Sequence, residues 1–152
     1  MTPDLFAGFG ILIMMNEQPE AGYREVEHTA DWQLEVWAPD LPLLFEQAAL
    51  GMYALSGTRL APEPRLERKI ALQDRDHEGL LVAFLSELLY LGESQGLGFD
   101  EFELQINGER LTARAKGARI ESQSKEIKAV TYHNLEIREA TRGLEVNIVF
   151  DV

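Results

Sequence analysis

Two alternating runs joined by Asn107 and Gly108 restrict the fold of this chain more than any other feature of the sequence. The dipeptide stands between residues 101–106 and residues 109–117, and both runs alternate apolar or small side chains with polar ones. Asn-Gly between such runs is the strongest short-range signal for a β-hairpin. We therefore predict a hairpin here, and the fold must contain antiparallel strands.

The stronger of two amphipathic segments predicts a helix that packs on this sheet. Asp74 or Asp76 caps its start, and Gly96 and Gly98 end it. Its wide apolar face consists of Leu80, Leu81, Phe84, Leu85, Leu88, Leu89 and Leu91. A face this wide has to be covered by other elements of the fold.

An earlier helix is predicted between Asp40, which can cap it, and Gly57, which ends it. Pro42 suits its first turn. Apolar residues recur at helical spacing between these limits: Leu44, Phe45, Ala48, Ala49, Met52 and Tyr53.

The remaining segments predict strands and the connections between them. We predict a loop at residues 58–65 and an irregular stretch at residues 118–126. The further strands that we predict are residues 23–27, 32–38, 65–73, 127–139 and 144–152. The chain is therefore predicted to be α+β, one domain with a mostly antiparallel sheet of about seven strands and two helices packed against it.

Composition narrows the class of protein. With 152 residues, 45% of them hydrophobic, the chain has enough apolar side chains for one core. Asp and Glu number 26 against 14 Lys and Arg, which gives a net charge of −12 and disfavours direct binding to nucleic acid. There is no cysteine, so disulfides, thiolate zinc sites and a cysteine nucleophile are excluded. We expect a cytoplasmic protein.

Residues 5–15 are apolar, but this run is too short to span a bilayer. Residues 1–4 contain Asp4 and no basic residue, which does not suit a signal peptide. We predict that residues 1–21 form a disordered or loosely packed extension and that residues 22–152 form the domain. Two alternatives remain, a biological start at Met15 and an apolar arm that packs on another subunit.

Several polar residues have an ordinary structural explanation. His28, Thr29 and Asp31 lie between two predicted strands, where such groups usually form a tight turn. The alternation of the strand predicted at residues 127–139 puts Lys128, Val130 and Tyr132 on one face and Thr131 and His133 on the other, and a structural role is the default for Tyr132 and His133. The sequence contains no glycine-rich phosphate loop and no H-E-x-x-H motif.

The end of the chain is less ordinary. Asp151 and Val152 complete an alternating apolar run, which places an acidic side chain and a terminal carboxylate at the end of a core strand. Ends of chains usually fray, so a fixed acidic end calls for a chemical reason.

Four segments together resemble the archease family. HTAD (28–31), HEGLLVAFLSELLYLGE (77–93), IKAVTYHNLEI (127–137) and the terminal FDV occur in the order found in that family. The resemblance runs from about Tyr23 to Val152. Ala118 stands where the family often has an acidic residue, so we assign no role to it.

The resemblance implies an accessory protein rather than an enzyme. Archeases assist a GTP-dependent RNA ligase that joins 2′,3′-cyclic-phosphate or 3′-phosphate ends to 5′-hydroxyl ends in tRNA splicing and RNA repair. They promote guanylylation of the ligase and its multiple turnover. The expected partner is therefore the ligase, with no direct contact to nucleic acid and no membrane.

The resemblance also implies a metal site at Asp31, Asp151 and Val152, and a role in activity for Lys128, which we place facing the partner. Three carboxylates form an oxygen-rich site that suits a hard divalent cation, with Ca²⁺ as the first expectation and Mg²⁺ as the second. Without a cation these groups would repel one another. The neighbouring polar residues that can support such a site are His28, Thr29, Tyr132 and His133.

Two competing hypotheses come from other classes. A small metal-dependent hydrolase would use Asp31 and Asp151 for its ion and His28 or His133 as base. A general chaperone or binding module would need an apolar surface, which residues 5–15 or an exposed Trp37 would have to supply.

Overall fold

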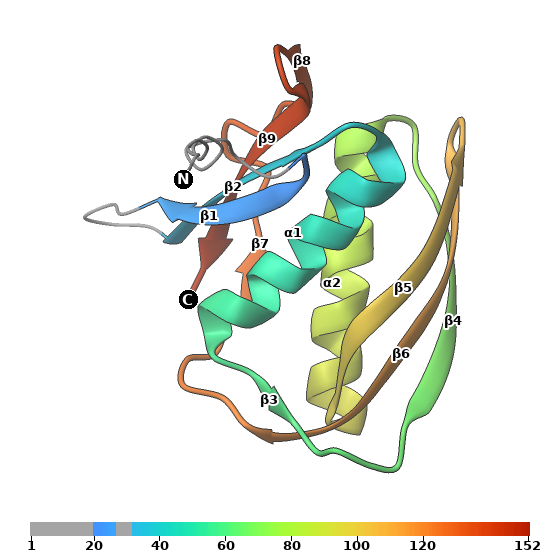
Figure 1. Cartoon of the computed structure of the whole chain (residues 1–152), viewed down its shortest axis with the longest axis vertical. Helices are drawn as coiled ribbons and strands as arrows, with labels where there is room; N and C mark the ends of the chain where they lie inside the picture. Colours follow the sequence, from blue (N-terminus) through green and yellow to red (C-terminus); the bar gives the residue numbers. More distant parts are fainter. Residues whose placement is uncertain (1–19, 27–31) are drawn as a thin grey trace, which may run out of the picture.

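The computed structural model describes residues 20–26 and 32–152, whose strands form two antiparallel sheets with both helices between them. Figure 1 shows the five-stranded sheet on the left, the four-stranded sheet on the right, and α1 and α2 between them. The structure confirms the α+β class and the two helices. It also shows that the strands divide into two sheets, which the sequence did not predict. Within the described residues, no helix is long and apolar enough to cross a membrane.

The five-stranded sheet carries the end of the chain. Its strands are β1 (Gly22–Val26), β2 (Trp32–Ala38), β7 (Ala129–Val130), β8 (Arg138–Ala140) and β9 (Gly143–Asp151). The order is β1-β2-β9-β7, and β8 also pairs with β9. Alternate residues of β2 and β9 are buried against the helices: Leu34, Val36, Val146, Ile148 and Phe150. The other face of this sheet is turned away from the helices, and we call it the outer face.

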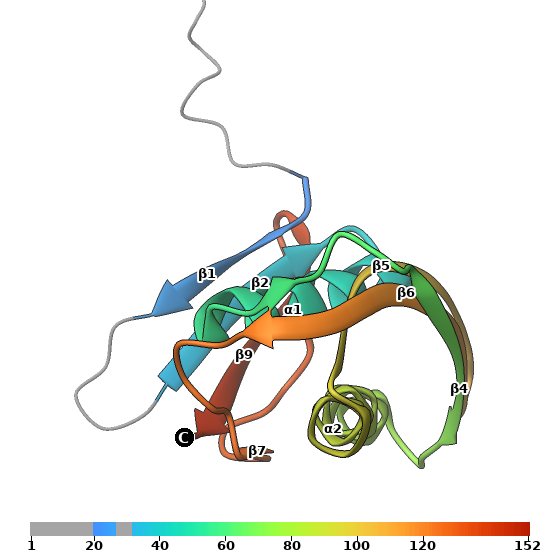
Figure 2. The ribbon, with the colours of Figure 1, turned by 90° about the horizontal axis from the view of Figure 1, so that it is seen from below.

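The four-stranded sheet contains the predicted hairpin. Its strands are β3 (Arg59–Leu60), β4 (Leu66–Gln73), β5 (Leu97–Asn107) and β6 (Arg110–Ser122). The turn lies at Asn107 and Gly108, and the positive φ of Gly108, 60°, explains the glycine. Figure 2 shows this sheet curving around α2.

The hairpin strands are longer than predicted. Residues 118–126 were expected to be irregular, but β6 continues to Ser122 and pairs there with the start of β5 and with β3. Ala118 is buried and lies opposite Gly98, which belongs to β5 and not to the end of the helix. These two small residues produce no visible apolar alternation in the sequence.

Both helices begin and end at capping residues. In α1 (Leu41–Ser56) the Asp40 side chain accepts the Leu43 N–H, and Gly57 follows with φ 64°. In α2 (His77–Gln95) the Asp76 side chain accepts the Gly79 N–H, so Asp76 and not Asp74 is the cap. The sequence thus predicted Asp40 and Gly57, and Asp76 as one of two candidates, because capping depends on local chemistry.

The predicted strand at residues 127–139 is wrong over most of its length. Only β7 and β8 are extended, and a turn lies between them in which the Leu135 N–H donates to the Tyr132 carbonyl. Thr131 donates from both its N–H and its hydroxyl to the Val149 carbonyl, both at 3.0 Å. The turn that follows includes Asn134 with φ 53°, a conformation that asparagine tolerates and most residues do not.

Candidate functional site

The last strand ends with side chains on both of its faces. Phe150 is buried in the core, and Asp151 is exposed on the outer face, as the alternation of a strand requires. Val152 follows on the core side, where its side chain is partly buried and packs against the core. An acidic side chain therefore lies in solvent between two residues whose side chains contact the core.

Neighbouring strands hold this end of β9 from both sides. The Lys128 N–H donates to the Asp151 carbonyl at 2.7 Å, and Ala129 pairs with Asp151 in β7. On the other side Trp32, the first residue of β2, pairs with Phe150. Because of these two pairings, the backbone that carries the Asp151 carboxylate is held within the sheet.

Three of the predicted site residues, His28, Thr29 and Asp31, lie outside the described residues. The two strands that flank them are described, and β1 ends at Val26 while β2 begins at Trp32. Within the described residues 20–26 and 32–152, no three His, Cys, Asp or Glu side chains gather as a metal cluster. The described part of the predicted metal site is therefore Asp151 with the adjacent Val152.

The side chains of Lys128 and Asp151 lie on opposite faces of the five-stranded sheet. Ala129 pairs with Asp151, and Val130 pairs with Phe150 in the core, so alternation puts Lys128 on the helix side with Val130. The shared face of Lys128 and Val130 agrees with the sequence. No ion pair connects Lys128 with Asp151 in the part of the chain that the structure describes.

Lys128 instead lines a cavity of about 380 Å³ between α2 and the segment that joins β6 to β7. We call this cavity the α2 pocket. Residues of α1 form another part of its wall. Its lining includes Tyr53, Leu89, Tyr90, Glu93, Glu126 and Lys128.

Backbone hydrogen bonds fix the joining segment on the end of α1. The N–H groups of Ser124 and Lys125 both donate to the Ser56 carbonyl, at 2.9 and 3.1 Å. A Cβ on Gly57 would also meet the Ser124 side chain, which would have to move. The wall of the α2 pocket that carries Glu126 and Lys128 therefore starts from a fixed point.

Tyr53 belongs to the lining of the α2 pocket and has an unusual hydroxyl. The hydroxyl oxygen is buried and has no hydrogen-bond partner among the described residues. Burial raises the pKa of Tyr53 far above its ordinary value, and the charge of Asp100 adds to the shift. The Phe99 backbone lies close enough to oppose this shift but not in hydrogen-bonding geometry. The hydroxyl is therefore neutral at physiological pH.

Tyr132 and His133 lie on the other side of the sheet from the α2 pocket. Both are exposed, Tyr132 to 61%, and they line a polar groove of about 680 Å³ on the outer face. Gln33 and Asn147 line the same groove. Tyr132 was expected to share a strand face with Lys128, but the strand ends at Val130 and the following turn places Tyr132 in this groove.

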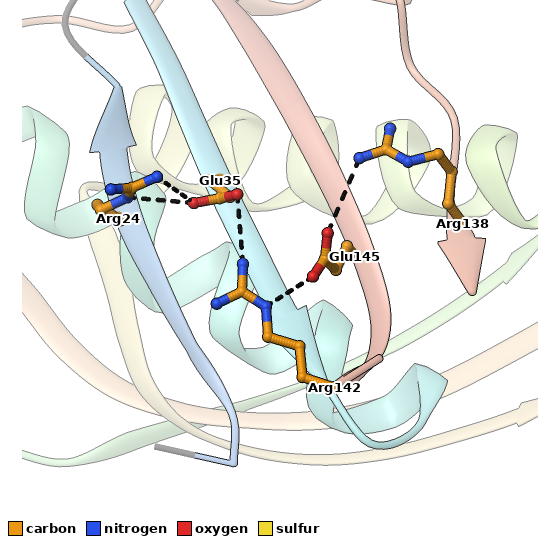
Figure 3. Close-up of polar contacts among 5 residues, drawn as sticks. All are labelled: Arg24, Glu35, Arg138, Arg142 and Glu145. Carbon is orange, nitrogen blue, oxygen red and sulfur yellow. Dashed lines mark hydrogen bonds and ion pairs between the residues drawn. The ribbon is translucent and has the colours of Figure 1, made fainter. Parts of the chain in front are cut away.

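Five charged residues cross the outer face as an alternating series, which we call the ladder. Figure 3 shows its order, which is Arg24, Glu35, Arg142, Glu145 and Arg138. The contacts are 2.7 Å between Arg24 and Glu35, 3.3 Å from Arg142 to Glu35, 2.6 Å from Arg142 to Glu145, and 3.9 Å from Arg138 to Glu145. Each carboxylate of the ladder therefore contacts two guanidinium groups.

Trp37 supports the centre of the ladder. The guanidinium carbon of Arg142 lies 4.1 Å from the centre of a Trp37 ring, and a Cβ on Gly22 would lie 2.7 Å from the indole. Trp37 is only 5% exposed as a result. The chaperone hypothesis named an exposed Trp37 as one source of apolar surface, and the structure contradicts that source; residues 5–15, the other source, lie outside the described residues.

Sequence reasoning missed the ladder and the α2 pocket. The alternation of β1 and β2 contained a signal for Arg24 and Glu35, but only the register of the two strands places them opposite each other. Glu93 and Glu126 belong to elements 33 residues apart, as the difference of their numbers shows, and no local pattern connects them.

Three comparisons place the chain among known proteins. The model of a family described as "Archease protein family (MTH1598/TM1083)" matches residues 23–152. The protein archease of Methanosarcina barkeri is 37% identical over 139 residues, which cover 86% of this chain and 95% of that protein. The protein archease of Thermococcus gammatolerans is 34% identical over 129 residues, covering 80% and 91%.

Two solved structures have a similar fold. One is described as the crystal structure of an archease, possible chaperone, from Thermotoga maritima, with a TM-score of 0.63, 25% identity, and coverage of 85% of this chain and 96% of that one. The other is a solution structure of Methanobacterium thermoautotrophicum protein 1598, with a TM-score of 0.62, 22% identity, and coverage of 86% and 99%. At 22% identity the second comparison supports the fold alone.

Proposed function

Because the chain belongs to the archease family, we propose that it is a non-catalytic, metal-binding accessory protein of a GTP-dependent RNA ligase. In this role it acts in the cytoplasm and promotes guanylylation and multiple turnover of the ligase. The ligase joins 2′,3′-cyclic-phosphate or 3′-phosphate RNA ends to 5′-hydroxyl ends. The observation that carries the proposal is an exposed carboxylate, that of Asp151, on a backbone that two neighbouring strands hold.

The donor set fits a hard divalent cation. Asp151 forms no ion pair with a described basic residue, so its carboxylate is available. Asp31 is bonded to Trp32, whose strand partner is the neighbour of Asp151, and this connectivity supports a shared site. With the carboxylate that Val152 carries in this sequence, all ligands are oxygens, which Ca²⁺ prefers and Mg²⁺ accepts. A bound cation would neutralise the repulsion between these carboxylates.

Lys128 has a separate part in this proposal. Its backbone N–H holds the Asp151 carbonyl, while its side chain lies on the helix side, in the α2 pocket, and not on the face of the Asp151 carboxylate. We assign the ammonium to contact with the ligase and not to the metal. The net charge of −12 agrees with a protein that contacts the ligase rather than its RNA.

The central experiment combines a thermal melt, with and without Ca²⁺ or Mg²⁺, and a multiple-turnover ligation assay. Asp31→Asn and Asp151→Asn should keep or slightly raise apo stability, because like charges are removed. The wild type should gain about 2.7 kcal/mol when the free ion is at about a hundredfold excess over its Kd. The two variants should lose most of this gain and also lose stimulation of the ligase.

Two controls complete this experiment. Glu139→Gln neutralises an exposed acid on β8 and should leave both the metal-dependent gain and the stimulation unchanged. Lys128→Ala should keep metal binding and lose stimulation. Normal stimulation by Asp31→Asn or Asp151→Asn would contradict the metal site, whereas no stimulation by the wild type would contradict the proposed function itself.

A tag distinguishes the terminal carboxylate from the side chains. Residues added after Val152 remove its charge and should abolish the metal-dependent gain in stability, while an N-terminal tag should not. Equal gains for the two tagged proteins would show that the terminal carboxylate is not a ligand.

A further inference from the structure

The wall of the α2 pocket carries charges that the rest of the described chain does not satisfy. Glu93, Glu126 and Lys128 are exposed, and none of them forms an ion pair with any residue in the ranges 20–26 and 32–152. Two carboxylates against one ammonium leave the wall negative. A cationic group is therefore favoured in this pocket, and a phosphate or carboxylate is not.

The remaining wall combines apolar and aromatic side chains with the polar side chains of Ser56, Ser86 and Gln123. Leu89 and Ile127 line the pocket beside the charged groups. Tyr90 lines it too, is 58% exposed, and lies three residues before Glu93, so the two side chains are neighbours on one face of α2. An arginine combines an apolar stem with a planar cation that stacks on aromatic rings. The stem suits the apolar part of this wall, and the cation suits its aromatic and acidic groups.

The molecule already holds one arginine by the same combination of groups. The guanidinium of Arg142 lies over Trp37 and contacts the carboxylates of Glu35 and Glu145. The α2 pocket presents an aromatic ring and two carboxylates, and none of its lining residues is an arginine. We propose that the α2 pocket receives an arginine side chain from a partner protein.

The size of the pocket agrees with this occupant. At about 380 Å³ it is near the lower end of the range for ligand pockets, which suits one long side chain. The pocket lies on the helix side of β7, opposite Asp151. Neither Asp151 nor Val152 lines the pocket, so the two sites can be altered separately, and only the identity of the partner as the RNA ligase rests on the function proposed above.

The first test uses a small probe and does not involve the ligase. Two-dimensional amide NMR spectra of the full chain are recorded during titration with N-acetyl-arginine amide. We expect saturable shifts at Tyr90, Glu93, Glu126 and Lys128. N-acetyl-citrulline amide, which has nearly the same shape without the charge, and N-acetyl-lysine amide, which has the charge without the planar head, should bind more weakly.

Matched variants locate the probe. The double variant Glu93→Gln with Glu126→Gln should bind the arginine probe about tenfold or more weakly, because it loses charge-assisted hydrogen bonds. Glu139→Gln removes an exposed acid outside the pocket and should bind as the wild type does. Absence of saturable shifts, equal binding of the citrulline probe, or equal binding by the double variant would each overturn the proposal.

The second test uses the ligase. Affinity for the ligase should fall about tenfold or more in the double variant, while Asp151→Asn should bind the ligase as the wild type does and fail to stimulate it. If the wild type binds the ligase and the double variant binds equally well, the pocket does not receive an arginine of the ligase and the inference is wrong. If the wild type neither binds nor stimulates the ligase, the proposed function is wrong, and the probe titration alone decides the chemistry of the pocket.

Discussion

The ladder around Arg142 and the α2 pocket contain the same kinds of chemical group. They differ in whether the carboxylates have an ionic partner among the described residues. In the ladder, each carboxylate contacts two guanidinium groups of the same chain (Figure 3). The indole of Trp37 covers the central arginine. In the pocket, Glu93 and Glu126 have no ionic partner among the described residues, and Tyr90 is largely exposed. The ladder therefore contributes to the stability of the fold, whereas the pocket groups remain available to another molecule.

The largest expected difference is between the two aromatic residues. Trp37→Ala should lower the free energy of unfolding by about 3–5 kcal/mol, because a buried ring and its contact with Arg142 are lost. Tyr90→Ala should change it by less than about 0.5 kcal/mol, because the ring is 58% exposed. Urea unfolding followed by circular dichroism measures both, and similar losses would remove the distinction between the two regions.

A pair of glycines tests the same distinction through packing. Gly22→Ala puts a Cβ 2.7 Å from the Trp37 indole and should cost about 1–3 kcal/mol. Gly92→Ala, at a residue that lines the α2 pocket, puts a Cβ no closer than 3.6 Å to Ile120 and Leu97. It should stabilise the protein by about 0.5–1 kcal/mol through helix propensity. Thermal melts of the two variants should shift in opposite directions, and a shift in the same direction would contradict this account.

The charged groups should differ less than the packed ones. Arg142→Met leaves Glu35 and Glu145 each with one guanidinium partner, and should cost about 1 kcal/mol since these side chains are 22% and 19% exposed. The double variant Glu93→Gln with Glu126→Gln lowers the net negative charge from 12 to 10, which is 12 − 2, and should leave stability unchanged within about 0.5 kcal/mol. A loss of stability in the double variant equal to that in Arg142→Met would mean that the pocket charges stabilise the fold.

Glu46 is partly buried, and its substitution should have the smallest effect on stability. It has no ionic partner among the described residues, and burial raises the pKa of this carboxyl. A raised pKa means that the folded state binds the proton more tightly, so ionisation of Glu46 lowers stability above that pKa. Glu46→Gln should therefore stabilise the protein at neutral pH by less than about 0.5 kcal/mol, because solvent screens the charge.

The pH dependence checks the sign of this effect. The advantage of Glu46→Gln should disappear as pH falls through the raised pKa, since Glu46 is then neutral in the parent protein as well. Melts of the two proteins across the acidic range measure this difference. An advantage that persists at low pH would have to come from packing and not from charge.

Local chemistry made part of this structure predictable from the sequence. Asp40, Asp76 and Gly57 cap helices through contacts with residues a few positions away, and Asn107-Gly108 closes its hairpin in the same way. The groups that act together in the ladder and in the α2 pocket come from elements far apart in the chain. Their proximity depends on the register of β2 with β9 and on the path of the segment after β6, which no local pattern encodes.

The same limit applies to the candidate site. The alternation of residues 144–152 was enough to put Asp151 on the exposed face and Phe150 in the core. The strand predicted at residues 127–139 put Tyr132 on the face of Lys128, but the strand ends at Val130 and the turn that follows places Tyr132 on the outer face. The path of a chain through irregular backbone depends on side-chain hydrogen bonds, such as those of Thr131, that have no periodic signal.

The pairing of β2 with β9 has a consequence for the order of folding. Residue 32 pairs with residue 150, so the five-stranded sheet closes only after nearly the whole chain is available. Until then β1 and β2 have no strand neighbours but each other, and a two-stranded unit is marginally stable in water. During synthesis on the ribosome, the four-stranded sheet and α2 can assemble first, and long-range loop closure then slows the last step. We therefore expect the sheet that carries Asp151 to become native last, and a chain that ends before β9 to leave it incomplete.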